Sequence, residues 1–293
     1  ALAALSTEEL LKDTQELTSL WETRKRETAI QFYEPVQEKA REFHDSTKRE
    51  ILISGGNRSS KTDTALAELV IQATGIIPYS LQDSYPKEKL LRRPLSARVV
   101  CASLTDTLEP VIKPKLQWWK WNGPGEPGSS RGHWGWMPRQ HLQYGDWTKA
   151  YSEKYRTLHL ADGGSIQFNS YDQEREHLSG GSFHLTVFDE LPPKGHYTEC
   201  KLRLLDTGGQ LITAMTPPTE ASGISAAWVY DALYEPGMGG HPDIAAFEFF
   251  TEHNRILRAR LRELPYDDIP HGTLNGYQTY ACRCDDCKLA RSR

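Results

Sequence analysis

The sequence predicts an α/β fold in which a mostly parallel β-sheet is flanked by helices. A short apolar run, residues 51–53, ends at Gly55-Gly56, and apolar residues then recur at helical spacing over residues 61–73. This order indicates a strand, a tight turn and a helix, the opening unit of an α/β domain. Further strand-like runs alternate with helical stretches along the chain. Hydrophobic residues make up 38% and charged residues 25% of the sequence, a globular composition that excludes a collagen-like or disordered chain.

The remaining elements follow from periodicity and turn signals. Residues 1–47 are polar with leucines at loose helical spacing, which predicts a helical N-terminal segment. Two alternating runs on either side of Asp162-Gly163-Gly164 predict a hairpin. Strands are expected at 98–102, 157–160, 165–168, 183–188 and 209–214, and a helix at 108–119. We divide the chain into the N-terminal segment (1–47), an α/β domain (48–255), and a linker with a small Cys/His-rich tail (256–293).

Charge and hydropathy limit the partners and the compartment. The net charge is −4, so binding to nucleic acid would require a local basic patch. The richest apolar stretch, residues 245–250, is far shorter than the ~18 residues of a membrane helix. Residues 1–5 lack the basic region of a signal peptide. We therefore expect a cytoplasmic protein that is neither secreted nor bound to a membrane.

Residues 55–62, GGNRSSKT, match the phosphate-binding pattern G-x-x-x-x-G-K-[ST] except that Ser60 replaces the second glycine. In such a loop, backbone N–H groups and the following helix N-terminus bind phosphates. Lys61 would neutralise the β- and γ-phosphates of ATP, and the Thr62 hydroxyl would ligate Mg²⁺. A purely structural glycine turn is the alternative. The predicted nucleotide-binding residues here are Gly55, Gly56, Asn57, Arg58, Ser59, Ser60, Lys61 and Thr62.

A second group of polar residues follows the expected strand at residues 183–188. In P-loop NTPases a buried strand beside the phosphate loop ends in an aspartate that holds Mg²⁺, and Asp189 fits this position. The adjacent Glu190 would orient and deprotonate the attacking water, which favours ATP hydrolysis. The strand at residues 209–214 leads to Thr216, and Thr213 and Thr216 are candidates for contacting the γ-phosphate. Solvated carboxylates and a polar turn are the alternatives.

Taken in order, GGNRSSKT, DGGSIQF, LTVFDE and LITAMTPP resemble the ATPase domain of the large terminase subunit of tailed phages, over roughly residues 30–255. This family drives double-stranded DNA into procapsids. The resemblance implies that Gln37 reads the adenine base. It implies that Arg58 is the phosphate-loop arginine. Ring ATPases often take an arginine from a neighbouring subunit; Arg175 is one candidate for that role, and Arg58, acting within its own chain, is the alternative. Asp189 and Glu190 match the metal aspartate and the catalytic glutamate, and residues 213–216 match the motif that couples hydrolysis to movement.

The resemblance also implies partners and a location. The subunits would form a ring docked on the portal of a procapsid in the host cytoplasm, and a small terminase subunit would select the DNA. A helicase-like DNA translocase is the alternative within the same fold. A non-catalytic module that binds nucleic acid or a partner through the Cys/His tail is the alternative of another class.

Two segments lie outside these motifs. Terminase large subunits usually continue into a nuclease domain, but the residues after Thr216 are fewer than the ~100–150 of a typical domain, so we expect no nuclease activity from this sequence. Its last residues instead offer a candidate zinc site of the Cys₃His type, although free surface thiols are the alternative. Residues 118–147 are rich in tryptophan and predict an aromatic sub-core or a contact surface. The candidate zinc ligands are His271, Cys282, Cys284 and Cys287.

Overall fold

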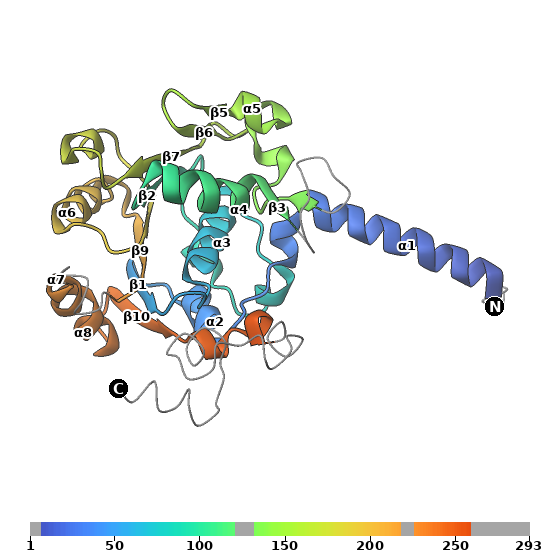
Figure 1. The fold of residues 1–293 in the computed structure, drawn as a ribbon, viewed down its shortest axis with the longest axis horizontal. Helices are drawn as coiled ribbons and strands as arrows, with labels where there is room; N and C mark the ends of the chain where they lie inside the picture. The colour runs from blue at the N-terminus through green and yellow to red at the C-terminus, as the bar shows by residue number, and fades with distance from the viewer. Residues whose placement is uncertain (1–6, 121–131, 218–225, 259–293) are drawn as a thin grey trace, which may run out of the picture.

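The computed structural model describes residues 7–120, 132–217 and 226–258, and an eight-stranded sheet forms its centre (Figure 1). The strand order is β10-β1-β9-β8-β2-β7-β6-β5. Neighbouring strands from β10 to β7 are parallel, whereas β7, β6 and β5 are antiparallel. The strands are β1 (Glu50–Gly55), β2 (Ser96–Cys101), β5 (Tyr151–Ser152), β6 (Thr157–His159), β7 (Ser165–Ser170), β8 (Leu185–Asp189), β9 (Gln210–Met215) and β10 (Ile244–Phe249). The predicted α/β class with a mostly parallel sheet is confirmed.

Helices cover both faces of this sheet (Figure 1). One face packs against α3 and its neighbours around Ile53, Leu69 and Val99. The other face packs against α6 and the α7-to-α8 segment around Leu52, Phe188 and Leu233. Strands covered on both faces are apolar throughout, which is why their sequences read as continuous hydrophobic runs. The helices are α2 (Glu38–Asp45), α3 (Lys61–Thr74), the π-helix η4 (Leu104–Ile112), α4 (Lys113–Gln117), α5 (Trp147–Ala150), α6 (Lys194–Leu202), α7 (Ala227–Val229), the π-helix η10 (Tyr230–Tyr234) and α8 (Glu235–Met238).

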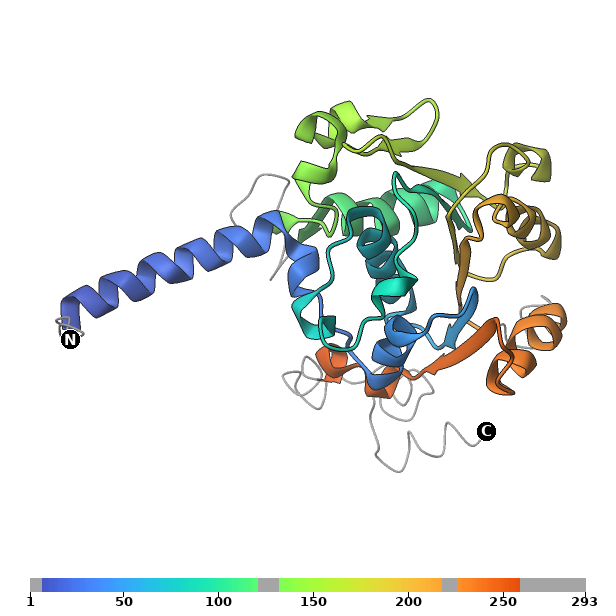
Figure 2. The ribbon, with the colours of Figure 1, turned by 180° about the vertical axis from the view of Figure 1, so that it is seen from behind.

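The N-terminal segment has two structurally different parts. Helix α1 (Thr7–Glu27) projects away from the body of the protein (Figure 2), and the ring of its Trp21 meets the edge of Phe32 at 4.8 Å. Residues 29–45, by contrast, belong to the core, where Ile30 and Phe43 are fully buried. None of the helices in the described ranges is both long and apolar enough to cross a membrane.

Several elements differ from the sequence-based expectation. Strand β9 lies between β1 and β8, an order of strands that the sequence did not indicate. Strand β10 was not predicted, because its residues do not alternate. The helix expected at 108–119 begins earlier, at Leu104, as a π-helix. The hairpin of β6 and β7 is confirmed. Trp136 and Trp147 are buried, as an aromatic sub-core requires.

A buried polar network joins α2, α3 and the segment that leads to β2. Glu68, in the middle of α3, is fully buried; its Oε2 lies 2.7 Å from His44 Nδ1 and its Oε1 lies 3.2 Å from Lys89 Nζ. The hydroxyl of Tyr85 and the amide of Gln72 also donate to Oε1, at 2.7 and 2.9 Å. Burial alone would raise the pKa of Glu68, but the Lys89 ammonium and the His44 hydrogen bond outweigh it and hold the pKa at about 2.

The neighbouring histidine is held neutral by the same burial. Burial lowers the pKa of His44 more than its contact with Glu68 raises it. Its Nδ1–H therefore donates to Glu68, and Nε2 accepts a hydrogen bond of 3.1 Å from the hydroxyl of Tyr33. Since His44 lies in α2 and Glu68 lies in α3, the network fixes α2 against α3.

Replacing Glu68 with glutamine should lower the free energy of unfolding by about 3 kcal/mol or more, because it leaves the Lys89 ammonium buried without its counter-charge. Glu42→Gln is the matched control, since Glu42 pairs with Lys39 on the surface and should cost less than about 1 kcal/mol. Urea unfolding measures both.

The pKa of Glu68, depressed from 4.5 to about 2, stabilises the fold above pH 4.5, and this stabilisation is lost as the pH falls toward 2. The Glu68→Gln variant should lack this component of acid sensitivity, and equal costs for the two variants would contradict the assignment.

Candidate functional site

The phosphate-loop residues connect β1 to α3 at the carboxyl edge of the sheet, as predicted. Gly56, Asn57 and Arg58 are exposed at the outer surface of the loop. Lys61, the first residue of α3, is buried and its Nζ donates to the carbonyl of Gly56 at 2.9 Å. Burial lowers the pKa of Lys61, and the carboxylates of Glu190 and Asp189 raise it. A buried ammonium held by its own loop carbonyl is a charge that a bound phosphate would satisfy better.

Ser60 occupies the position of the missing glycine in a left-handed conformation, with φ 68° and ψ 23°. Glycine is usual here because left-handed backbone is strained for residues that carry a side chain. The Ser60 hydroxyl donates to the carbonyl of Ser59 at 2.5 Å, and Gln37 Nε2 donates to the same carbonyl at 2.6 Å. These two bonds hold the peptide that precedes the strained residue.

Gly55 is required for a different reason. A Cβ atom built on Gly55 would lie 2.1 Å from the carbonyl oxygen of Phe249, the last residue of β10 and its partner in the sheet. No side chain fits at that distance. The first glycine of the loop is therefore fixed by the neighbouring strand.

The hydroxyl of Thr62 and the carboxylate of Asp189 meet across the intervening strand. Thr62 Oγ1 donates to Asp189 Oδ1 at 2.6 Å. Burial raises the pKa of Asp189 to about 6, although the bond from Thr62 lowers it. A carboxylate whose charge is unfavourable at rest gains from a nearby cation. Two hard oxygen atoms in contact suit Mg²⁺, which takes its other ligands from phosphates and water.

This pair differs from a metal site made of protein side chains alone. In the described part of the chain, no three His, Cys, Asp or Glu side chains gather as a metal site. The residues present fit Mg²⁺ that arrives with a nucleotide.

Glu190 follows Asp189 with φ 71°, a second left-handed residue that carries a side chain. Its amide donates to the carbonyl of Ala214 at 2.8 Å and so extends the β8–β9 ladder. Its carboxylate accepts a hydrogen bond of 3.1 Å from the amide of Thr216, and the Thr216 hydroxyl lies 3.4 Å away. The same hydroxyl is 3.5 Å from Asn57 Oδ1. Thr216 thus lies between the phosphate loop and the predicted catalytic glutamate.

The other predicted residues occupy varied positions. The Gln37 amide bridges the phosphate loop and β10, since its Oε1 accepts a hydrogen bond of 3.3 Å from the amide of Phe250. Thr213 is fully buried inside β9, on the face with Leu211 and Met215, and its hydroxyl has no partner there. Its predicted contact with the γ-phosphate stays a prediction, as does adenine recognition by Gln37. The zinc ligands proposed at residues 271–287 lie outside the described residues.

A group of residues directly after β10, which no sequence motif marks, also contacts the site. Thr251 Oγ1 donates to the carbonyl of Asn57 at 2.7 Å, and Asn254 Nδ2 donates to that of Arg58 at 2.8 Å. Arg255 donates to the carbonyl of Pro35 at 2.6 Å. These side chains fasten the segment to backbone carbonyls of the phosphate loop and of the chain before α2. Backbone acceptors leave no pattern in a sequence, so no motif could have identified them.

Lys115 of α4 is a further charge near the site. It forms an ion pair with Asp63, which follows Thr62, and its charge lowers the pKa of Asp189.

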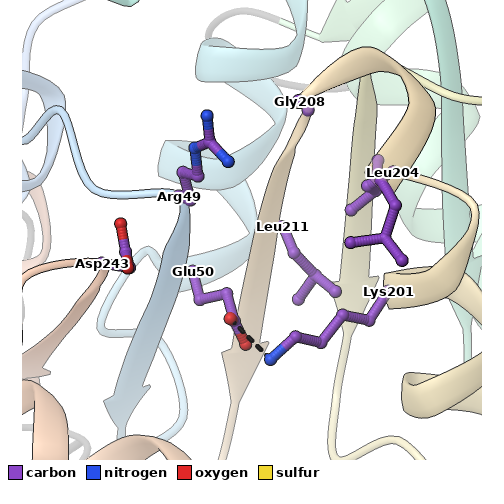
Figure 3. Close-up of a pocket in the computed structure, with 9 residues that line it drawn as sticks. Arg49, Glu50, Lys201, Leu204, Gly208, Leu211 and Asp243 are labelled. Atoms are coloured by element: carbon purple, nitrogen blue, oxygen red, sulfur yellow. Dashed lines mark ion pairs between the residues drawn. The ribbon is translucent and has the colours of Figure 1, made fainter.

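A pocket lies at the opposite edge of the sheet (Figure 3), and none of the predicted site residues lines it. It opens at the amino ends of β1 and β9, where Lys201 Nζ pairs with Glu50 Oε1 at 2.7 Å. Its lining residues are Arg49, Glu50, Lys201, Leu204, Leu205, Gly208, Gly209, Leu211 and Asp243.

Replacing Ser60 with glycine should raise the free energy of unfolding by about 0.5–1 kcal/mol, because relief of left-handed strain exceeds the added entropy of the unfolded chain. Ser84→Gly is the control. Ser84 is exposed and outside the left-handed region, so glycine there should be destabilising by about 0.5–1 kcal/mol. Urea unfolding of both variants checks the prediction, and a Ser60→Gly variant less stable than the parent would refute it.

Comparisons with known proteins found one matching family and similar solved structures. Residues 52–274, more than half of the chain, match the sequence profile of the family described as terminase large subunit, T4-like virus type, N-terminal. Two solved structures of the large terminase ATPase domain of Thermus phage P74-26, one a point mutant, are 15% identical to the chain and cover 85% of it. These alignments span 94% of the mutant chain and 93% of the other, with TM-scores of 0.43 and 0.42. No curated protein matched the sequence. On the profile match, the chain belongs to the terminase large-subunit family, whose function is ATP-driven packaging of DNA.

Proposed function

We propose that this chain hydrolyses ATP at the phosphate loop and that hydrolysis moves double-stranded DNA into a procapsid. The observation that carries the proposal is the hydrogen bond of 2.6 Å between Thr62 and Asp189. It brings the predicted magnesium ligands together from two separate elements, with Lys61 and Glu190 beside them. Solvated carboxylates at a strand end would not be buried against the phosphate loop as Asp189 is.

Each group has a defined task. Lys61 and the amides of residues 56–61 hold the β- and γ-phosphates. Thr62 and Asp189 hold Mg²⁺, which neutralises charge on the phosphates when bound. Arg58 is exposed on the loop and stabilises the charge that develops on the transferred phosphoryl group. Gln37, which already contacts the loop, reads the adenine base.

Glu190 supplies the base. Its carboxylate orients the attacking water and accepts its proton, while the Thr216 amide keeps the carboxylate directed toward the phosphate loop. Because the Thr216 hydroxyl lies near both Asn57 and Glu190, loss of the γ-phosphate changes the surroundings of both contacts. This is a physical basis for the proposed coupling of hydrolysis to movement.

The assembly would be a ring of subunits docked on the portal of a procapsid in the host cytoplasm, with the small terminase subunit selecting the DNA. A net charge of −4 means that DNA contact must use local positive patches. Double-stranded DNA carries dense negative charge, so translocation by this chain should weaken as salt is raised.

Replacing Glu190 with glutamine should lower ATP turnover by about 10²-fold or more, while ATP affinity stays close to that of the parent. The amide oxygen of glutamine can still accept the Thr216 bond, but it cannot take a proton from water. Turnover assays with DNA and portal-bearing procapsids, together with nucleotide titrations, measure the two effects. Glu153→Gln is the control, since Glu153 is exposed near the other edge of the sheet. Parental turnover in the Glu190→Gln variant would overturn the assignment.

We also propose that His271, Cys282, Cys284 and Cys287 bind zinc. The purified chain should then carry about one zinc ion, which is lost when Cys284 and Cys287 are replaced by serine, while ATP binding is retained. Cys200→Ser is the control, because Cys200 is a buried free thiol inside the fold and its loss should leave the zinc content unchanged. Metal analysis under reducing conditions decides the question, and absence of zinc from the parent protein removes the proposal.

A further inference from the structure

Tyr171 stands between the sheet and the predicted catalytic carboxylates. It follows β7 directly, and its amide donates to the carbonyl of Cys101 at 3.0 Å, which extends the pairing of β7 with β2. Its partly buried ring tilts against Phe188, with centroids 6.3 Å apart, and meets His196 edge-on at 6.1 Å. No sequence motif identifies Tyr171, because it lies 18 residues before Asp189 and follows a different strand.

The hydroxyl of Tyr171 reaches across the end of β2 to the last residue of β8 and the residue after it. It lies 3.1 Å from the carbonyl oxygen of Asp189 and 2.8 Å from that of Glu190. Because β2 separates β7 from β8, the side chain and its hydrogen bonds together bridge about two strand spacings, roughly 10 Å. One hydroxyl proton is therefore shared between two consecutive carbonyl groups.

Holding two consecutive carbonyl groups has a geometric consequence. The carbonyl of Asp189 belongs to the peptide plane before the Glu190 Cα atom, and the carbonyl of Glu190 belongs to the plane after it. A residue has only two soft backbone dihedral angles, which are the rotations of these two planes. A hydroxyl that binds both carbonyls thus restrains φ and ψ of Glu190 together.

That restraint acts where the backbone would otherwise relax. Glu190 has φ 71°, a conformation that residues with a side chain rarely adopt. Backbone in sparsely populated regions persists where surrounding contacts over-determine it, and such residues gather at active sites. The amide of Glu190 is already bound by Ala214, so Tyr171 completes the restraint from the carbonyl side.

The hydroxyl keeps its proton. Burial, reinforced by the negative charge of Asp189, raises the pKa of Tyr171 well above its ordinary value of 10.0. Both of its partners are carbonyl oxygens, which only accept, so the Tyr171 hydroxyl is the donor in both bonds.

We infer that Tyr171 is a positioning residue for Glu190: its hydroxyl fixes the backbone conformation from which the carboxylate is directed at the phosphate loop. This inference rests on the proposed role of Glu190 as the base. Tyr171 acts on hydrolysis only through Glu190 and contributes nothing to nucleotide binding.

The test is Tyr171→Phe in the full chain, assayed for kcat, for KM and for ATP affinity in the presence of Mg²⁺. Phenylalanine keeps the contacts of the ring and removes only the hydroxyl. We expect kcat to fall about tenfold or more, since small misplacements of a catalytic group have effects of this size. KM and ATP affinity should change less than about threefold, and retained affinity shows that the variant is folded. All assays are run about ten degrees below the thermal midpoint of the least stable variant.

Tyr197→Phe is the matched control. The Tyr197 ring also packs on Phe188, at 5.8 Å, but its hydroxyl donates to Glu50 at the opposite end of the sheet, at 2.6 Å. The two phenylalanine variants should lose similar stability, whereas Tyr197→Phe should keep the parental kcat. Equal losses of kcat in both variants would show that Tyr171 has only a structural role and would overturn the inference.

The double variant separates this inference from the proposed function. In a Glu190→Gln background, Tyr171→Phe should change the residual turnover less than about twofold, because the group it positions no longer acts. A full tenfold loss in that background would overturn the inference, as would parental kcat in Tyr171→Phe when Glu190→Gln is inactive. Parental turnover in Glu190→Gln would overturn the proposed function, and the inference with it.

Discussion

The bond between Thr62 and Asp189 joins residues 127 positions apart in the sequence and aligns α3 with the sheet. Thr62 lies in the first turn of α3, and Asp189 ends β8, which β9 separates from the phosphate-loop strand β1. About two turns further along α3, Glu68 binds His44 of α2 and the ammonium of Lys89. The helix is thus fixed at its start by the site and in its middle by a buried charge network. Both restraints act on the helix that begins with Lys61.

Strained backbone accumulates around this helix and is restrained there by specific contacts. Arg58, Ser60 and Glu190 all have left-handed φ values, of 61°, 68° and 71°. The carbonyl of Arg58 is bound by Asn254, and the peptide before Ser60 is bound by Gln37. A site held this way has its conformation set before substrate arrives, so binding energy need not be spent on ordering the loop.

Much of the site could be predicted because its chemistry is contiguous in sequence. Lys61 and Thr62 open a helix after a glycine turn, and Asp189 and Glu190 close a buried strand, so each pair carries its own local signal. The order of strands carries no such signal, which is why the insertion of β9 was not foreseen. Strand β10 has no alternation, because only Ile244 and Phe249 are buried. Thr251, Asn254 and Tyr171 act on backbone carbonyls, and the identity of the residue that supplies a carbonyl is irrelevant to the bond.

The contact of Gly55 with β10 bears on how such motifs are interpreted in other chains. The carbonyl of Phe249 excludes any side chain at this position whether or not a phosphate is bound nearby. A descendant that had lost nucleotide binding but kept this strand pairing would still retain the glycine. Its persistence therefore reports the architecture of the sheet. The ammonium of Lys61 has no comparable packing requirement, because it binds only a carbonyl of its own loop. Loss of Lys61 would therefore distinguish an inactive descendant from a working motor.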